Sequence, residues 1–188
     1  MYARFGKRLL DLLVAGAAVI LSSPLLALIG GLIRLEDGPP VIYRQLRPGR
    51  DGRPFTILKF RSMPHHSVEA PSATMRTAEV TRVGRVIRRL NVDELPQLFN
   101  ILRGDMSLVG PRPPLGSQQD LVELRRAGGA ILLRPGLTGL AQVNAYDGMT
   151  SEAKACFDNT YAAQVTPRND LVIIARTVLY LLRPPPTY

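Results

Sequence analysis

The feature that most constrains this chain is one apolar run near its start. Residues 12–33 carry no charged side chain, and the run reaches the roughly 20 residues that a helix needs to match the hydrocarbon core of a bilayer. It is too long for the apolar core of a signal peptide, and it leads into Arg34 rather than into a small-residue cleavage site. We therefore expect a retained helix that associates with a membrane.

A proline interrupts this run, which raises the question of whether the helix crosses the membrane or turns back. Pro24 has no N–H for the carbonyl of Ile20, so a helix through this point bends or breaks. The hydroxyls of Ser22 and Ser23 can bond the carbonyls that the proline leaves free, which makes such a break tolerable in lipid. The Ser-Ser-Pro sequence therefore predicts an interruption that can survive inside a membrane.

The charges that flank the run favour a helix that turns back. A spanning helix is expected to show an excess of basic residues on one side only, whereas this run has them on both sides. They are Arg4, Lys7 and Arg8 before it and Arg34, Arg44 and Arg47 after it. Both ends should then lie on the cytoplasmic side, which predicts a re-entrant helix broken at Ser23-Pro24. The alternative is a proline-kinked helix that spans the membrane once.

The length and charge of the chain limit its organisation and its partners. With 188 residues it fits one structural unit, in which we separate a re-entrant membrane helix at 1–36 from a cytoplasmic, membrane-associated domain at 37–188. The 24 basic residues exceed the 15 acidic ones and give a net charge of +9. This excess indicates an anionic partner, either nucleic acid, lipid headgroups or a phosphorylated substrate.

The remaining patterns predict an α+β fold that is mainly helical. The segments VIYRQL and FTILKF flank a turn with Asp51-Gly52, which predicts a short β-hairpin. Apolar and arginine residues alternate at helical spacing over 82–89, which predicts an interfacial amphipathic helix. Further helices are expected at 121–127 and 170–182, with a turn-rich connection at 134–139 between them.

A second helix should follow the basic one and carry two adjacent carboxylates in its first turn. It begins either at Asn91, with Glu94 completing a capping box, or nearer Asp93, where Pro96 is better tolerated. In both registers Asp93 and Glu94 lie at the helix N-terminus and Gly104 ends the helix.

Several familiar chemistries have no motif here. The chain has no glycine-rich nucleotide-binding motif, no H-E-x-x-H, no pair of cysteines, and only two histidines, His65 and His66, in an expected surface loop. Among the remaining groups, Asp93 and Glu94 are the strongest candidates. One carboxylate can attack phosphorus to form an acyl phosphate while a second holds Mg²⁺; the alternative is that the pair only stabilises a helix N-terminus.

Three segments in order along the chain resemble the signature blocks of a known family. They are KFRSM at 59–63, DELPQLFNILRGDMSLVGPRP at 93–113 and RPGLTGLAQVN at 134–144. These residues look like those of the bacterial sugar transferases, the monotopic phosphoglycosyl transferases. The resemblance implies transfer of a sugar phosphate from a UDP-sugar to a polyprenyl phosphate such as undecaprenyl phosphate, with release of UMP. It places the enzyme on the cytoplasmic face of the bacterial inner membrane, at the first membrane step of glycoconjugate assembly.

The resemblance also implies roles for individual residues. Asp93 would be the nucleophile that forms a covalent phosphosugar intermediate, and Glu94 would bind Mg²⁺. The family's re-entrant break falls on Ser23 and Pro24. Substrate contacts are expected from the following set: Lys59, Arg61, Arg88, Pro111, Arg112 and Asp158. For Asp158, a purely structural role is the alternative.

One departure weakens the assignment of the sugar. Many members have Gly-Arg where this chain has Ala145-Tyr146, so a basic residue near the diphosphate or sugar is missing. The implied partners are a UDP-sugar, a polyprenyl phosphate and the bilayer, while downstream glycosyltransferases and a second copy of the chain stay open. Nucleic acid is not expected, since the arginines lack interleaved aromatic residues.

Two other functions compete with the transferase. The first is a membrane-tethered basic protein that binds anionic lipid or nucleic acid without catalysis; it accounts for the charge and the apolar run but not for the ordered blocks around Asp93. The second is a catalytically silent member of the family that acts as a scaffold, which an intact Asp93-Glu94 pair disfavours.

Overall fold

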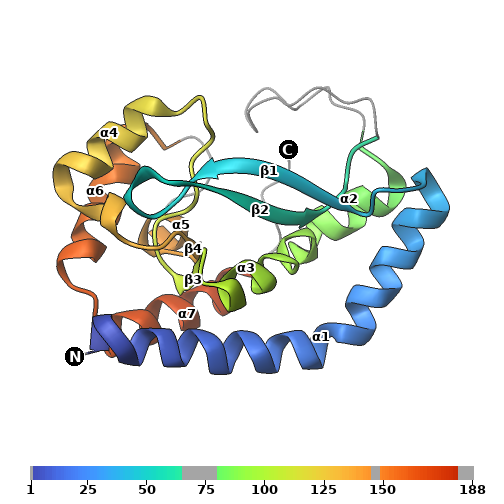
Figure 1. The fold of residues 1–188 in the computed structure, drawn as a ribbon, viewed down its shortest axis with the longest axis horizontal. Helices are drawn as coiled ribbons and strands as arrows, with labels where there is room; N and C mark the ends of the chain where they lie inside the picture. The colour runs from blue at the N-terminus through green and yellow to red at the C-terminus, as the bar shows by residue number, and fades with distance from the viewer. Residues whose placement is uncertain (1, 65–79, 145–148, 182–188) are drawn as a thin grey trace.

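A long bent helix runs along one side of the molecule, and the rest of the fold packs against its inner face (Figure 1). The computed structural model describes residues 2–64, 80–144 and 149–181, so the expected loop histidines and Ala145-Tyr146 lie outside the described residues. A π-helical turn at Tyr2–Gly6 leads into this helix, α1 (Lys7–Asp37). The fold is mainly helical with two small sheets, in agreement with the predicted class.

Helix α1 continues through Pro24 and bends along its length (Figure 1), so the predicted break is a bend in one uninterrupted helix. The serine hydroxyls bond the carbonyls as predicted. Ser22 Oγ donates to the carbonyl oxygen of Ala18 at 2.6 Å, and Ser23 Oγ donates to that of Ile20 at 2.8 Å. Because the Ser23 bond satisfies the Ile20 carbonyl, to which Pro24 cannot donate, the backbone bends without losing its helical path.

Only a narrow stripe of α1 faces protein. Its buried side chains are Asp11, Ala15, Ile29 and Ile33. Large apolar side chains cover the other faces and are exposed, among them Leu13, Ile20, Leu21, Leu28 and Leu35. By length and composition α1 is able to cross a membrane, and little of its apolar stretch is buried inside the protein. This exposed surface supports membrane association.

The N-terminal end of α1 is tied to the rest of the fold by buried polar contacts. Lys7 Nζ lies 2.6 Å from Asp170 Oδ2, at the start of the last helix. Asp11 is 2% exposed, and its Oδ1 accepts hydrogen bonds from Ser107 Oγ at 3.0 Å and from the Leu108 N–H at 2.9 Å. A buried carboxylate with several donors is difficult to detach, because removing them leaves the charge without partners.

The C-terminal end of α1 is tied to the same body. Arg61, which follows the hairpin, donates to the Asp37 carbonyl at 2.8 Å and pairs with its carboxylate at 2.9 Å. The carboxylate of Glu36 accepts from the N–H groups of Arg82 and Val83 at 2.7 and 2.9 Å. Both ends of this apolar helix therefore contact one folded unit.

The predicted hairpin is confirmed. Strands β1 (Ile42–Pro48) and β2 (Pro54–Phe60) pair antiparallel, with Arg44 opposite Leu58 and Tyr43 opposite Lys59. The connection contains a 3₁₀ turn at Arg50–Gly52, in which Asp51 and Gly52 have φ of 59° and 74°. These positive φ values explain why an Asp-Gly pair stands at the turn.

The free edge of β2 is covered by one side chain. Asn100 is fully buried; its Nδ2 donates to the Thr56 carbonyl at 2.7 Å and its Oδ1 accepts from the Leu58 N–H at 3.0 Å. A single amide thus replaces the partner that a third strand would supply. It fixes the hairpin on the helix that carries Asn100.

The segment with the two carboxylates differs from the prediction. After α2 (Arg82–Arg89), Asn91 adopts φ 54° and makes no side-chain cap, and Asp93 and Glu94 lie in a separate 3₁₀ turn at Val92–Glu94. Helix α3 (Gln97–Arg103) starts only after Pro96. The left-handed residue reverses the chain after α2, so the capping box cannot form. Gly104, with φ 97°, ends α3 as predicted.

The remaining elements form a second layer. Strands β3 (Ser107–Val109) and β4 (Gly136–Thr138) pair in parallel where only a turn-rich connection was expected. Short helices η5 (Ala130–Leu132) and α5 (Leu140–Asn144) flank β4. A Cβ on Gly136 would lie 2.1 Å from the Gly110 nitrogen, so glycine is required for this close pairing. The core beside these strands includes Ile101, Met106 and Val109.

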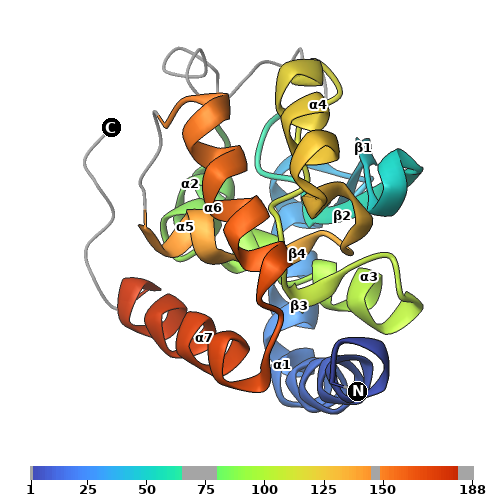
Figure 2. The same ribbon diagram turned by 90° about the vertical axis from the view of Figure 1, so that its left-hand side faces the viewer.

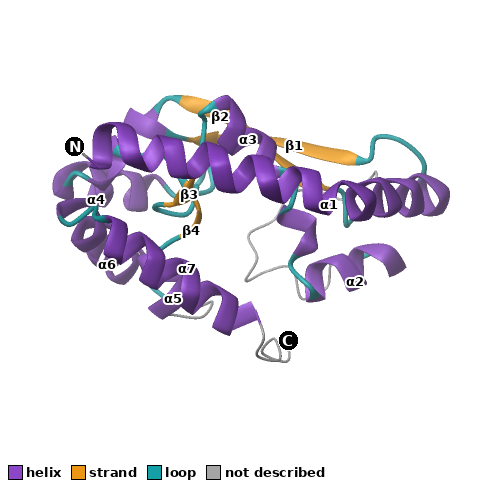
Figure 3. Ribbon diagram, turned by 90° about the horizontal axis from the view of Figure 1, so that it is seen from below, coloured by secondary structure: helices purple, strands orange, loops and turns teal. Residues whose placement is uncertain are grey.

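Three longer helices complete the chain. Helix α4 (Gln119–Gly128) confirms the helix expected at 121–127 and packs beside α6 (Ser151–Ala163), which was not predicted (Figure 2). Helix α7 (Pro167–Leu181) confirms the last predicted helix and lies on the same face of the molecule as α1 (Figure 3). Its exposed side chains include Leu171, Val172, Val178 and Leu179.

Candidate active site

The turn with Asp93 and Glu94 lies beside β2 and receives basic side chains from two other segments. Glu94 Oε1 accepts from Lys59 Nζ at 2.8 Å and from Arg112 Nη2 at 2.6 Å, and Arg112 Nη1 lies 3.4 Å from Oε2. The Glu94 side chain is 17% exposed. Lys59 belongs to the first of the three sequence blocks, and Glu94 and Arg112 lie at the two ends of the second block, so these contacts bring the three places together.

The two carboxylates of the pair have different electrostatic surroundings. Burial alone would raise the pKa of Glu94, but the charges of Arg112 and Lys59 and their hydrogen bonds outweigh burial and hold that pKa well below its usual range. Glu94 is therefore an anion at any physiological pH. Its position is fixed by two cations.

Asp93 is in the opposite situation. Burial and the neighbouring negative charge of Glu94 raise its pKa above the ordinary value, while Lys59 and Arg88 act to lower it. In the described part of the chain no basic side chain forms a salt bridge with Asp93. Its carboxylate is thus less stabilised than that of Glu94 and open to a ligand, which suits a group that attacks a substrate.

Arg88 reaches the site from α2, which is held close to the end of the hairpin. Thr81 Oγ1 accepts from the Gly84 N–H at 2.9 Å and caps the helix. A Cβ on Gly84 would lie 2.1 Å from the Ser62 carbonyl oxygen. Glycine at this position therefore lets α2 lie close to the segment that follows β2, with Arg88 near enough to Asp93 to lower its pKa.

Arg112 is positioned by a buried ion pair behind it. Arg125 on α4 donates to the Arg112 carbonyl at 2.9 Å, and its Nε and Nη2 donate to Asp158 Oδ2 at 2.9 and 2.6 Å. The side chains of Arg125 and Asp158 are 4% and 2% exposed. Asp158 therefore contacts Arg125 and is linked to Arg112 through it.

The structure gathers some of the predicted site residues and separates others. Lys59, Arg88 and Arg112 surround the carboxylate pair, whereas Arg61 is buried at the end of α1. Pro111 supports the loop through its carbonyl, which accepts from the Gly136 N–H at 2.9 Å.

Sequence reasoning missed Arg125. It shares the buried face of α4 with Leu121 and Val122, and an arginine at an apolar position of a helix signals a buried ion-pair partner elsewhere. That signal was present in the spacing, but the helix that carries Asp158 had not been predicted.

The carboxylate pair suits Mg²⁺ only when a bound substrate supplies further oxygen ligands. The described residues contain no group of three or more side chains suited to a metal. Mg²⁺ commonly uses one or two carboxylates together with waters and substrate phosphates. Within the described ranges, the one hydrogen bond that Glu94 Oε2 accepts is long, at 3.4 Å from Arg112 Nη1. Glu94 and the adjacent Asp93 are therefore suitable ligands once phosphate oxygens supply the remainder.

Comparison with known proteins gives one consistent result. The profile of the bacterial sugar transferases matches residues 2–184. The chain is 42% identical over 186 residues to a UDP-glucose:undecaprenyl-phosphate glucose-1-phosphate transferase of Caulobacter vibrioides, covering 94% of this chain and 69% of the relative. The exopolysaccharide production protein ExoY of Rhizobium meliloti is 38% identical over 191 residues, with 92% and 83% covered.

The match to a third relative covers a smaller part of that relative. It is a UDP-N-acetylgalactosamine-undecaprenyl-phosphate N-acetylgalactosaminephosphotransferase of Aeromonas hydrophila, 40% identical over 185 residues, with 95% of this chain and 44% of the relative covered. The part shared with this chain includes the segments that form the carboxylate site.

Proposed function

This chain belongs to the bacterial sugar transferase family, and on that premise we propose that it moves a sugar phosphate from a UDP-sugar to a polyprenyl phosphate and releases UMP. Relatives are named as transferases that use UDP-glucose or UDP-N-acetylgalactosamine with undecaprenyl phosphate. The acceptor of this chain is then undecaprenyl phosphate or a close isoprenoid equivalent. The reaction belongs to polysaccharide biosynthesis.

The observation that carries this proposal is the difference between Asp93 and Glu94. Asp93 attacks the β-phosphorus of the UDP-sugar through a carboxylate oxygen, and the bond from that phosphorus to the bridging oxygen breaks, so UMP leaves with the electron pair. An oxygen of the lipid phosphate then attacks the same phosphorus and displaces Asp93. The raised pKa of Asp93 and its lack of a paired cation in the described residues support the nucleophilic role.

The basic residues around the pair serve the diphosphate. Lys59, Arg88 and Arg112 supply three cations from three different segments, and arginine suits bidentate contacts to phosphate. Glu94, with Asp93 beside it, would hold Mg²⁺, which neutralises phosphate oxygens when bound. Glu94 also keeps Lys59 and Arg112 oriented before the donor binds.

The contacts of α1 support a re-entrant placement on one side of the membrane. Its ends are tied to one folded body through Lys7, Asp11, Glu36 and Asp37. A spanning helix would place its two ends on opposite sides of the hydrocarbon core, whereas here one folded body on one side of α1 contacts both ends. The bent helix therefore enters and leaves on the same face, which we assign to the cytoplasmic side of the inner membrane.

The basic residues that flank α1 are weaker support for the cytoplasmic placement than the sequence suggested, because some of them bind within the protein. Lys7 pairs with Asp170, and Arg8 donates to the Ile101 carbonyl at 2.6 Å. These two charges serve the fold. Exposed Arg44 stays available to an anionic cytoplasmic leaflet.

Intact-protein mass spectrometry tests the reaction directly. The purified chain is incubated with Mg²⁺ and separately with UDP-glucose, UDP-galactose and UDP-N-acetylgalactosamine, without lipid. One donor should add the mass of a sugar phosphate and release UMP. Asp93→Asn should lose both adduct and turnover, and Glu94→Gln should keep its fold but lose most activity. Near wild-type turnover by Asp93→Asn, or an adduct that maps to Glu94, would contradict the assigned roles.

A further inference from the structure

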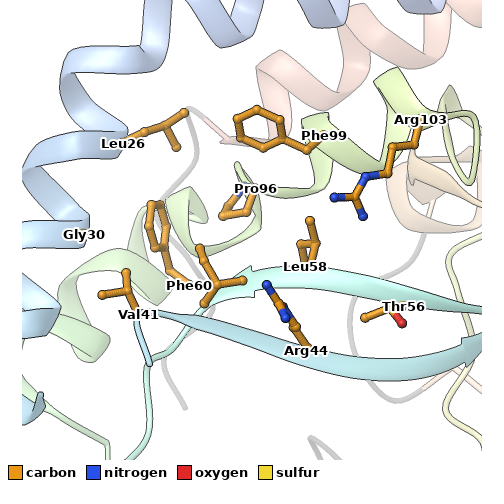
Figure 4. Close-up of a pocket in the computed structure, with 11 residues that line it drawn as sticks. Leu26, Gly30, Val41, Arg44, Thr56, Leu58, Phe60, Pro96, Phe99 and Arg103 are labelled. Atoms are coloured by element: carbon orange, nitrogen blue, oxygen red, sulfur yellow. The ribbon is translucent and has the colours of Figure 1, made fainter. Parts of the chain in front are cut away.

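A cavity of about 590 Å³ lies between the second half of α1, α3 and the face of the hairpin that is turned toward these two helices (Figure 4). Its apolar lining comes from all three elements: Leu26, Val41, Leu58, Phe60, Pro96 and Phe99. Phe99 on α3 is 41% exposed, so the apolar lining of the cavity reaches the protein surface. A site next to a membrane helix with such walls suits a hydrocarbon chain.

Two arginines enter this apolar cavity from opposite walls. Arg44 comes from β1 and Arg103 from the end of α3, and both guanidinium groups point inward near Leu58 (Figure 4). Among the residues that the structure describes, neither side chain has an ion-pair or hydrogen-bond partner. Two cations that converge without an anion repel each other, so the arrangement favours a negatively charged group between them.

This cavity is separate from the carboxylate site. Side chains alternate between the two faces of a strand; Lys59 reaches Glu94, while its neighbours Leu58 and Phe60 line the cavity. The hairpin and Pro96 thus stand between the arginine pair and Asp93. A phosphate held by Arg44 and Arg103 is not in position for attack at the covalent intermediate, which excludes the reacting lipid as the preferred occupant.

We propose that this cavity binds one anionic glycerophospholipid of the surrounding bilayer. Its phosphate lies between Arg44 and Arg103, and an acyl chain follows Leu26, Phe60 and Phe99 toward the membrane. Charge complementarity selects the headgroup, and the apolar walls next to α1 select a lipid over a soluble phosphate. The inference goes beyond the proposed reaction and uses only the membrane placement of α1.

A bound lipid would connect the three elements that carry the cavity. Arg44 belongs to the strand paired with the Lys59 strand, and Arg103 ends the helix whose Asn100 holds that strand. The lipid therefore fastens the hairpin to α1 at the membrane surface. A bilayer with anionic lipid should hold the carboxylate site in its working arrangement better than a neutral one.

Native mass spectrometry of the full-length chain tests this site without any UDP-sugar. The protein is released from nanodiscs of phosphatidylcholine with added phosphatidylglycerol, and retained phosphatidylglycerol is counted per chain. The wild type should retain one molecule. Arg44→Gln combined with Arg103→Gln should lower retention roughly tenfold or more, in line with the loss of two basic contacts. Arg53→Gln combined with Arg168→Gln, which removes the same charge from exposed positions, should behave as the wild type.

Several outcomes would overturn the inference. These are unchanged retention in the Arg44/Arg103 variant, and equal loss in the Arg53/Arg168 control, which would indicate general surface charge. Displacement of phosphatidylglycerol by equimolar undecaprenyl phosphate would make the cavity an acceptor site. Equally effective displacement by soluble glycerol phosphate would remove the role of the apolar walls. Because retention is measured without donor, failure here and failure of the transferase reaction give separate signals.

Discussion

Ser23 Oγ donates a 2.8 Å hydrogen bond to the carbonyl oxygen of Ile20. This is the oxygen for which Pro24 has no N–H, because it lies four residues earlier in the helix. The serine thus supplies the donor that the proline removes, at a point where Ile20, Ser23 and Pro24 are exposed. The pair explains how α1 bends among apolar surroundings without leaving a carbonyl unsatisfied.

The bend leads to a prediction about membrane topology. In a Cys156→Ser background, single cysteines at Ala3 and Arg53, both exposed, should be labelled from the same side of sealed inner-membrane vesicles, because both ends of α1 contact one body. Labelling from opposite sides would establish a spanning helix.

Restoring the missing backbone donor should weaken this topology. Ser23→Ala combined with Pro24→Leu lets residue 24 donate to the Ile20 carbonyl and straightens α1. A straight helix favours a single span, so the position 3 label should become accessible from the other side in part of the molecules. Ser23→Ala alone leaves the proline in place and serves as the control, with same-side labelling retained.

The raised pKa of Asp93 predicts an acid limb in the rate of adduct formation. The ionised carboxylate is the nucleophile, so the rate should fall as pH decreases through this pKa. Arg88 acts to lower that pKa, and Arg88→Gln should therefore shift the acid limb to higher pH. Arg85→Gln removes an exposed arginine from the same helix and should leave the limb in place. Rapid-quench mass spectrometry over a pH series measures both.

Breaking the buried Arg125–Asp158 ion pair should strongly destabilise the fold. Asp158→Asn leaves a buried guanidinium without its anion and should lower the free energy of unfolding by about 3–5 kcal/mol. Glu123→Gln is the matched control. Glu123 pairs with Arg126 at 3.8 Å, and the Arg126 and Glu123 side chains are 51% and 69% exposed. Loss of this surface pair should lower the free energy of unfolding by less than about 1 kcal/mol. Thermal unfolding in detergent compares them, and equal shifts would contradict the buried role.

The same pair should affect substrate binding through Arg112. Arg125→Lys keeps the charge but loses the geometry that bonds both Asp158 and the Arg112 carbonyl. We expect a higher KM for the UDP-sugar and a smaller change in kcat, because the substitution loosens a phosphate contact and leaves Asp93 unchanged. A lower kcat at unchanged KM would show that Arg125 acts on another step.

Metal removal provides a further test of Glu94. If Glu94 and substrate phosphates hold Mg²⁺, excess chelator should abolish adduct formation, and added Mg²⁺ should restore it. Calorimetry should find weak Mg²⁺ binding to the free protein and tighter binding when a UDP-sugar analogue is present, because the described side chains alone do not complete a site. Unimpaired turnover in chelator would remove the metal from the mechanism.

Sequence patterns predicted the elements that are determined by a few neighbouring residues. The Asp51-Gly52 turn and the Gly104 helix end both require positive φ, and both occur where expected. The strands at 107–109 and 136–138 were missed, because three residues are too few to show a period of two and their pairing depends on the close approach of Gly110 and Gly136.

The candidate site was predictable in its central residues and not in its supports. Sequence resemblance identified Lys59 and Arg112, which do meet Glu94. It also suggested Arg61, whose position one residue beyond the strand instead directs it to the end of α1. Arg125 occupies a buried position of α4, which is a local signal, but its partner Asp158 lies on α6, and pairing between distant helices leaves no pattern in the sequence that identifies the partner.

The inward stripe of α1 has a practical consequence for making the protein water-soluble. Deleting the helix would remove Ala15 from the core and leave Ser107 and Asp170 without Asp11 and Lys7. The truncated remainder should aggregate. A soluble version instead needs polar substitutions restricted to the outward side chains, such as Leu13, Ile20, Leu21 and Leu28, so that the helix is retained as a wall of the fold while losing its affinity for lipid.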